Sequence, residues 1–228
     1  MKLGERVYGQ FCPVAMGAEI FATRWTPIVL RELLSGSTRF SELQRGMPLM
    51  SRSLLARRLQ ELEQAGLVEK RAEPDGRGPT WHLTEAGEAL RPVVIALGDW
   101  AHHWLTREIP EHDLDPSLLM WDMRRTVDAA GFPTPARTVV QFQFPDVQPK
   151  QRLWWLLAER GLVELCWKRP APDNDLEVTA LLADMVLIWI DRLPLSAALT
   201  DGRIRLDGPP TQRDAFSRWF RPGRGKHR

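Results

Sequence analysis

Basic side chains gather in one short stretch of a sequence whose total charge is almost balanced. The 228 residues include 31 Lys and Arg against 29 Asp and Glu, a formal net charge of +2. Residues 39–58 hold five arginines against the single acid Glu42: Arg39, Arg45, Arg52, Arg57 and Arg58. Guanidinium groups bind phosphate oxygens and guanine base edges. We therefore expect any nucleic-acid contact to be local and to involve this stretch.

Residues that could build a catalytic or metal site lack the required spacing. His102 and His103 are adjacent, so on a helix they point about 100° apart and do not face one metal as an i, i+4 pair does. His82 and His112 have no suitably spaced partners. The sequence contains no G-x-S-x-G, Walker or G-x-G-x-x-G motif. We predict a protein that is not an enzyme and that uses no cofactor or metal.

Cysteine content and hydropathy indicate the kind of cellular compartment in which the protein works. Cys12 and Cys166 lie far apart in the sequence, which does not suggest a disulfide framework. No stretch approaches the ~20 consecutive apolar residues of a membrane span, and the N-terminus lacks the apolar segment of a signal peptide. We expect a cytoplasmic protein with reduced thiols and no membrane partner.

Three of the five arginines fall on a predicted helix with one apolar and one polar face. Ser51 caps this helix and Gly66 ends it. Leu55, Leu59 and Leu62 form an apolar stripe at positions i, i+4 and i+7. The opposite face carries Ser53, Ala56, Arg57 and Gln60, with Arg52 and Arg58 on its flanks. Such a helix buries its leucines and presents its polar face outward.

The elements around this helix predict a winged helix-turn-helix. They are helices at 13–22, at 26–36 and from 39, strands at 67–71 and 80–83, and a long helix at 84–104. Thr38 or Ser41 is the expected cap of the third helix, and Pro92 is expected to kink the last one. The two strands enclose a turn cluster with Arg77 at the tip, which makes this hairpin the wing.

Several motifs in one order resemble the HxlR family of bacterial winged-helix regulators. They are CPVA (12–15), RWT (24–26), LRELL (30–34), RFSEL (39–43), SRSLL (51–55), LQELEQAGLV (59–68) and LTEAG (83–87). The resemblance covers about residues 8–105 in register. It implies a homodimer, joined through its first and last helices, that binds an inverted repeat in double-stranded DNA. The apolar residues Leu97, Trp100, Ala101 and Trp104 on the last helix would then be covered by the two-fold mate.

The expected DNA contacts follow from the basic helix face and the wing. They are Arg39, Ser51, Arg52, Ser53, Arg57, Arg58 and Arg77. The alternative is that these arginines are solvated surface charges. Arg57 would reach guanine O6/N7 or a phosphate, and the sequence does not choose between them. For Cys12 two interpretations stand, a redox sensor as the resemblance implies for this region, or a small buried hydrophobe. Cys166 is expected to have a packing role only.

The second half reads as a separate, smaller α+β domain at residues 118–221. A linker at 108–117 precedes it and a basic tail at 222–228 follows. Its strands are predicted at 138–144, 152–159, 162–168, 176–179 and 203–208, with helices at 118–130, 180–190, 194–198 and 211–220. The element order and the ending DGRIRLDG (201–208) resemble the sterol-carrier-protein fold over about residues 135–220.

That second resemblance implies a sheet covered by helices around an apolar tunnel that holds lipids. The candidate ligand-lining residues are Phe142, Phe144, Trp154, Trp155, Met185 and Trp189. A filled core would use the same residues. Trp154 and Trp155 are expected to face a common interior.

The overall prediction is an α+β protein that regulates transcription by sequence-specific DNA binding. Its C-terminal domain would bind an apolar small-molecule effector or support the dimer. Two alternatives stay open: a carrier of lipid or another hydrophobic ligand with an accessory winged helix, and a thiol-based redox sensor that uses Cys12. A salt-dependent DNA shift assay distinguishes the first alternative, and replacement of Cys12 tests the second.

Overall fold

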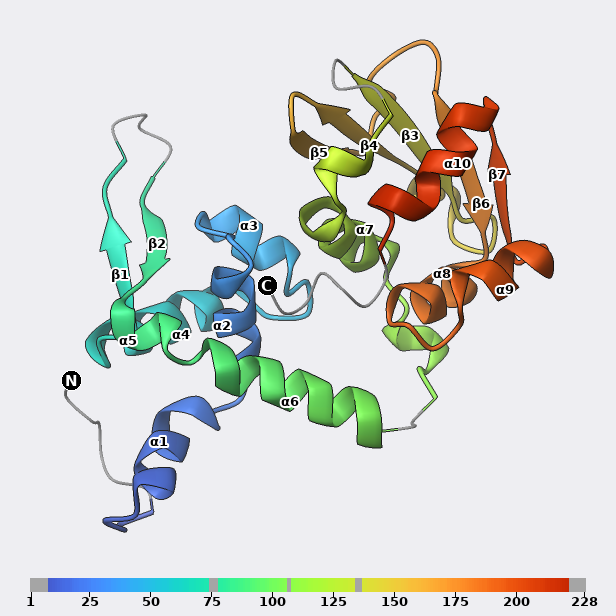
Figure 1. Cartoon of the computed structure of the whole chain (residues 1–228). Coiled ribbons are helices and arrows are strands. Elements are labelled where there is room, and N and C mark those ends of the chain that lie inside the picture. Colours follow the sequence, from blue (N-terminus) through green and yellow to red (C-terminus); the bar gives the residue numbers. More distant parts are fainter. Residues whose placement is uncertain (1–7, 74–77, 106–107, 134–136, 222–228) are drawn as a thin grey trace. The chain divides into compact units, whose positions relative to one another are not determined.

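The protein is described by a computed structural model that covers residues 8–73, 78–105, 108–133 and 137–221 (Figure 1). The chain divides into two compact units, residues 1–107 and 108–228. Arg77 and the basic tail at 222–228 lie outside the described residues.

The first unit is a helical core followed by a two-stranded hairpin. Its elements are α1 (Pro13–Phe21), α2 (Thr26–Leu34), α3 (Phe40–Arg45), α4 (Arg52–Gln64), β1 (Val68–Arg71), β2 (Thr80–Leu83), α5 (Glu85–Glu88) and α6 (Arg91–Trp104). The core is built from α2, α3, α4 and the hairpin, with Val29, Leu43, Leu55 and Leu59 fully buried. β1 and β2 pair antiparallel, and an isolated bridge between Arg39 and Thr80 joins the hairpin to the start of α3.

Two helix ends differ from the sequence prediction. The residue that precedes α3 is Arg39 rather than Thr38 or Ser41, because the Glu42 carboxylate accepts the backbone N–H groups of Thr38 and Arg39, both at 3.0 Å. The predicted long last helix is two helices, since α5 ends at Glu88 and α6 begins at Arg91. Pro92 has no N–H to donate, and its ring clashes with the carbonyl four residues earlier, that of Glu88. The proline therefore begins a new helix instead of kinking one.

The second unit is a five-stranded sheet with helices. Its elements are η1 (Glu111–Asp113), α7 (Pro116–Thr126), η2 (Ala129–Gly131), β3 (Thr138–Gln143), η3 (Pro149–Gln151), β4 (Leu153–Glu159), β5 (Leu162–Cys166), β6 (Leu176–Ala180), α8 (Leu182–Trp189), α9 (Leu195–Thr200), β7 (Ile204–Asp207) and α10 (Pro210–Trp219). The strand order is β5-β4-β3-β6-β7, in which β3 and β6 are parallel and the other pairs antiparallel. The predicted linker at 108–117 contains η1 and the start of α7.

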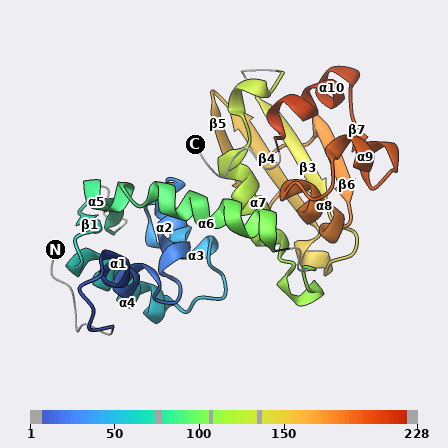
Figure 2. The same ribbon diagram turned by 60° about the horizontal axis from the view of Figure 1, so that its bottom comes forward.

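One face of this sheet packs against α7, α8 and α10 to form the core of the unit (Figure 2). Phe142 of β3 lies opposite Trp154 of β4 and Val178 of β6, and all three side chains are buried. Residues directly opposite each other on paired strands point to the same face of a sheet, so these three side chains lie on one side. From α10, Trp219 stacks on Phe132 with ring centroids 4.5 Å apart.

Trp154 and Trp155 do not face a common interior, contrary to the sequence prediction. Adjacent residues of a strand point to opposite faces of a sheet. Trp154 belongs to the helix-covered core, whereas Trp155 is buried on the other face, where its Nε1 donates to Asn174 Oδ1 at 3.2 Å. Asn174 Nδ2 in turn donates to Gln141 at 3.1 Å and to Glu177 at 2.8 Å. This polar network ties the segment before β6 to the sheet.

Candidate nucleic-acid interface

Helix α4 carries the candidate interface, and its two faces are as different as the sequence predicts. Ser51 precedes the helix, and its hydroxyl accepts the backbone N–H of Leu54 at 3.3 Å. Leu55, Leu59 and Leu62 are buried in the core of the first unit. The opposite face is exposed to solvent and consists of Arg52, Ser53, Ala56, Arg57 and Gln60.

Three polar side chains at the beginning of α4 are brought together on the exposed face. The Arg52 guanidinium lies 5.0 Å from the centroid of the Phe40 ring, which connects α4 to α3. The Ser51 and Ser53 hydroxyls are 3.3 Å apart. Arg57 follows further along the same face, with 65% of its side chain exposed, and its Nε lies 3.7 Å from Glu61 Oε1. An exposed pair of this kind is weak, so Arg57 is able to turn toward another acceptor.

The structure does not place all the predicted contact residues on this face. Arg58 is only 10% exposed and forms an ion pair with Glu61, because its position lies beside Leu55 and Leu59 on the buried side of the helix. Arg39 is half-buried at the start of α3, where its backbone bridges Thr80 of the wing. Of the predicted contact residues, the exposed face of α4 therefore carries Arg52, Ser53 and Arg57, with Ser51 at its start.

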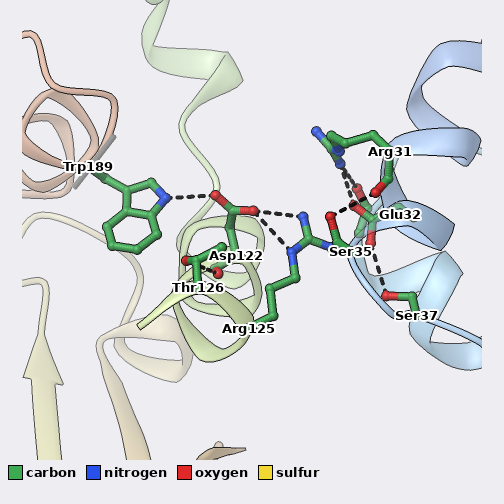
Figure 3. Close-up of polar contacts among 9 residues, drawn as sticks. Arg31, Glu32, Ser35, Ser37, Asp122, Arg125, Thr126 and Trp189 are labelled. Atoms are coloured by element: carbon green, nitrogen blue, oxygen red, sulfur yellow. Dashed lines mark hydrogen bonds and ion pairs between the residues drawn. The ribbon is translucent and has the colours of Figure 1, made fainter. Parts of the chain in front are cut away.

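Sequence reasoning missed a buried carboxylate next to the turn before α4. Glu32 of α2 is fully buried, and it accepts from Arg31 Nη2 at 2.6 Å and from the Ser37 hydroxyl at 3.3 Å (Figure 3). Arg31 Nη2 also donates to the carbonyl of Gly46 at 3.1 Å. A Cβ at Gly46 would overlap the Glu32 carboxyl, so any other residue there would force this buried, hydrogen-bonded carboxyl to shift. The sequence signal that could have indicated this buried carboxylate is the position of Glu32 between the leucines of LRELL (30–34).

A second set of bonds holds the same turn, residues 46–50. Gln44 Nε2 donates to the carbonyl oxygens of Met47 at 3.2 Å and Met50 at 2.6 Å. The Met47 and Met50 side chains are buried in the core. The angle at which α4 leaves α3 is therefore determined by buried contacts rather than by the exposed residues.

The described part of the wing adds positive charge next to an aromatic support. Lys70 Nζ lies 5.6 Å from the centroid of the Trp81 ring, and Arg71 forms an ion pair with Glu69. The backbone N–H of Trp81 donates to the Thr38 carbonyl at 2.8 Å, which anchors the hairpin to the helices. Its predicted tip residue, Arg77, lies outside the described residues.

Helices α1 and α6 expose large apolar side chains. Neither helix has a buried residue. Val14 of α1 is 78% exposed, and Leu97, Trp100 and Trp104 of α6 are 45%, 54% and 66% exposed. Apolar side chains of this size on two helices are typical of a surface that pairs with another protein.

In the second unit the six predicted ligand-lining residues are all buried. Phe142, Phe144, Trp154, Met185 and Trp189 belong to one core cluster, and Trp155 lies outside it. The polar end of Trp189 is satisfied internally, since its Nε1 donates to Asp122 Oδ2 at 2.7 Å (Figure 3). A hollow of about 410 Å³ at α9, β7 and α10 is lined by other residues: Leu199, Gly202, Ile204, Arg205, Leu206, Arg213 and Asp214.

Both cysteines are free thiols. Cys12 is the residue before α1 and is partly exposed. Burial, together with the neighbouring charge of Glu164, raises the pKa of Cys166. Within the described ranges, no group of three or more His, Cys, Asp or Glu side chains could hold a metal ion. The same residues include no helix long and apolar enough to cross a membrane.

Comparisons with known proteins agree with the geometry of the first unit. The HxlR-like helix-turn-helix family profile matches residues 20–109. YvaP, an HTH-type transcriptional regulator of Bacillus subtilis strain 168, is 33% identical over 112 residues, which cover 48% of this chain and 95% of YvaP. The HTH-type transcriptional regulator YodB of the same strain is 35% identical over 92 residues, which cover 40% of this chain and 82% of YodB.

Among solved structures, the reduced form of YodB from B. subtilis aligns with a TM-score of 0.38 and 31% identity, covering 44% of this chain and 100% of that one. On the strength of the family profile and of the identity to YvaP along nearly its whole length, the chain belongs to the HxlR-like helix-turn-helix family.

Proposed function

We propose that this protein is a transcriptional regulator that recognises a specific sequence in double-stranded DNA through α4. The observation that carries the proposal is the exposed polar and basic face of α4, Arg52, Ser53 and Arg57, on a helix whose other face is fixed in the core. The second helix of a helix-turn-helix enters the major groove and places its leading residues at base edges. Membership of a family of DNA-binding regulators supports the same function.

The exposed side chains of α4 and of the wing suit particular contacts to DNA. Arg57 is long enough to donate to O6 and N7 of one guanine or to a phosphate. Ser51 and Ser53 offer hydroxyls for phosphate or base-edge hydrogen bonds. Lys70 at the wing would contact the phosphate backbone beside the groove, where its charge contributes affinity but no sequence information.

The assembly that fits this recognition is a homodimer on an inverted repeat. Apolar side chains on α1 and α6, including Val14 and Trp104, would be removed from water between two copies. A two-fold axis would present two α4 helices to successive major grooves, about 34 Å apart.

The test is selection of bound duplexes from a random library, followed by a gel shift assay over a range of salt concentrations. We expect an enriched palindromic sequence and affinity that falls steeply with salt. Binding of the full-length chain without any sequence enrichment would contradict the proposal.

For the second unit we propose a sterol-carrier-like domain that supports the dimer or binds a small apolar effector. The strand order and the helices over one sheet face are compatible with that fold. We assign the effector to the hollow beside β7, where Ile204 and Leu206 offer an apolar floor. Thermal shift titration of fatty acids, sterols and aromatic hydrophobes against the full chain tests this, since a bound ligand raises Tm by mass action. No shift across the panel would leave the domain with the supporting role.

A thiol switch at Cys12 is a second candidate. Cys12 is a free, partly exposed thiol next to α1, beside the exposed side chains of Phe11 and Val14. Solved structures of YodB include diamide-treated and quinone-bound forms. We expect diamide to change DNA binding of the native chain and to leave that of Cys12→Ser unchanged. The same response in both proteins would remove Cys12 from the mechanism.

A further inference from the structure

Leu49 is a large apolar side chain exposed at an unusual place. It is 84% exposed in the turn between α3 and α4, two residues before Ser51. Among the described residues of the first unit, the other exposed large hydrophobic side chains lie at residues 8–14, at the start of α2, or in and directly after α6. Leu49 is separate from these segments in the sequence, and it precedes the polar exposed face of α4.

The exposure of Leu49 is imposed by the turn. On its two sides Met47 and Met50 are 1% and 2% exposed and occupy the core positions. The Met50 N–H donates to the Met47 carbonyl at 3.0 Å, and Gln44 Nε2 bonds to both of their carbonyl oxygens. With the backbone held at both ends, the leucine side chain has no core position left. A partner that covers it would find it already in place and would lose little chain entropy on binding.

The surroundings of Leu49 indicate the kind of partner. Arg45 at the end of α3 and Arg52 at the start of α4 are both exposed, so an apolar side chain lies between two cations in the sequence. The DNA major groove has the complementary pattern, because phosphates line its edges and the thymine 5-methyl group is its apolar feature. A protein partner would need an acidic rim around an apolar centre.

We propose that Leu49 contacts a thymine 5-methyl group and so contributes to the choice of operator sequence. The inference rests on the proposed function, since it places Leu49 in the groove that α4 enters. It adds an apolar specificity contact to the polar contacts of Arg52, Ser53 and Arg57. A leucine in this position favours thymine over cytosine, which has no methyl group at that edge.

The experiment replaces single thymines by deoxyuracil in a duplex that the wild-type protein has selected from a random library. Deoxyuracil differs from thymine only in the missing 5-methyl group. We expect wild-type affinity to fall about fourfold at one thymine position in each half-site, the loss expected for one buried methyl group. Leu49→Ala should bind the thymine duplex more weakly and should show no loss at that same position.

Two controls separate the possible outcomes. Leu162→Ala removes a leucine of the second unit that is 69% exposed and should keep the wild-type pattern of losses. Because Leu49 is largely exposed, Leu49→Ala should keep the wild-type Tm. An equal deoxyuracil loss in wild type and Leu49→Ala at every position overturns the inference, as does a wild type that is insensitive at every thymine. A change in self-association in place of a change in thymine sensitivity assigns Leu49 to a protein contact and also overturns it. If wild type selects no sequence at all, the proposed function itself fails.

Discussion

Replacing Arg57 by alanine should separate DNA affinity from stability. Its side chain is 65% exposed and points away from the stripe formed by Leu55 and Leu59. Arg57 Nε lies 3.7 Å from Glu61 Oε1, and the Glu61 side chain is 44% exposed. Exposed pairs contribute about 0.2–1 kcal/mol, and Glu61 keeps its second partner Arg58. We therefore expect the free energy of unfolding of Arg57→Ala to change by less than about 0.5 kcal/mol.

The effect of Arg57→Ala on operator binding should be much larger. A bidentate arginine–guanine contact is worth about 1–3 kcal/mol, which corresponds to a loss of about 5- to 150-fold in affinity per half-site. A phosphate contact would instead weaken binding to all duplexes alike and lower the slope of log K against log salt by about 1 per contact.

The assay is fluorescence anisotropy with the selected duplex and with an unrelated duplex, each at several salt concentrations. Arg57→Lys keeps the charge but not the fork of donors, so it should rescue a phosphate contact and not a guanine contact. Arg218→Ala, which removes an exposed arginine from α10 of the second unit, is the matched control and should bind as wild type. Unchanged affinity of Arg57→Ala for the selected duplex would refute the assignment of Arg57 to the interface.

Three further predictions concern assembly, packing and thiol chemistry. Trp104→Asp places a charge on the apolar face of α6 and should shift the protein from the proposed dimer to a monomer in sedimentation velocity at micromolar concentration; an unchanged dimer would place the interface elsewhere. Gly46→Ala inserts a methyl group against a buried carboxylate and should cost about 1–3 kcal/mol in urea unfolding. Gly17→Ala, within α1 and with open space around it, should instead gain about 0.5–1 kcal/mol, and equal effects of the two would argue against the overlap. The raised pKa of Cys166 keeps its thiol protonated to higher pH, so Glu164→Gln should lower that pKa and speed alkylation at pH 8, as measured by peptide mass mapping; an unchanged rate would exclude Glu164 as a cause.

Local physical rules in the sequence determined the elements and most of the interface helix. The spacing of Leu55, Leu59 and Leu62, with Ser51 before them and Gly66 after them, located α4 almost to the residue. Each of these signals acts within one or two turns of helix, so no distant residue can override it easily. The β4–β5 hairpin is also a local structure, since Arg160 and Gly161 adopt the positive φ angles of 53° and 78° that a two-residue turn requires.

The wrong prediction that Trp154 and Trp155 face a common interior could have been avoided from the sequence. Trp154 and Trp155 are neighbours on β4, and the alternation of a strand already requires that they face opposite sides. The break between α5 and α6 has a similar origin, since the clash of Pro92 with the carbonyl of Glu88 is a local effect.

Only the tertiary structure decided which polar groups are buried and which strands pair across long stretches of sequence. Arg58 follows Arg57 in α4 and is turned by about 100° around the helix axis. Arg58 is buried in an ion pair and Arg57 is exposed, because the rest of the unit packs against the Arg58 side of the helix. The Glu32 carboxyl contacts Gly46, which is 14 residues away in the sequence. β3 pairs in parallel with β6, which follows it by more than 30 residues. Such contacts form between segments that carry no mutual signal in their local sequence, because burial and pairing depend on the whole packed chain.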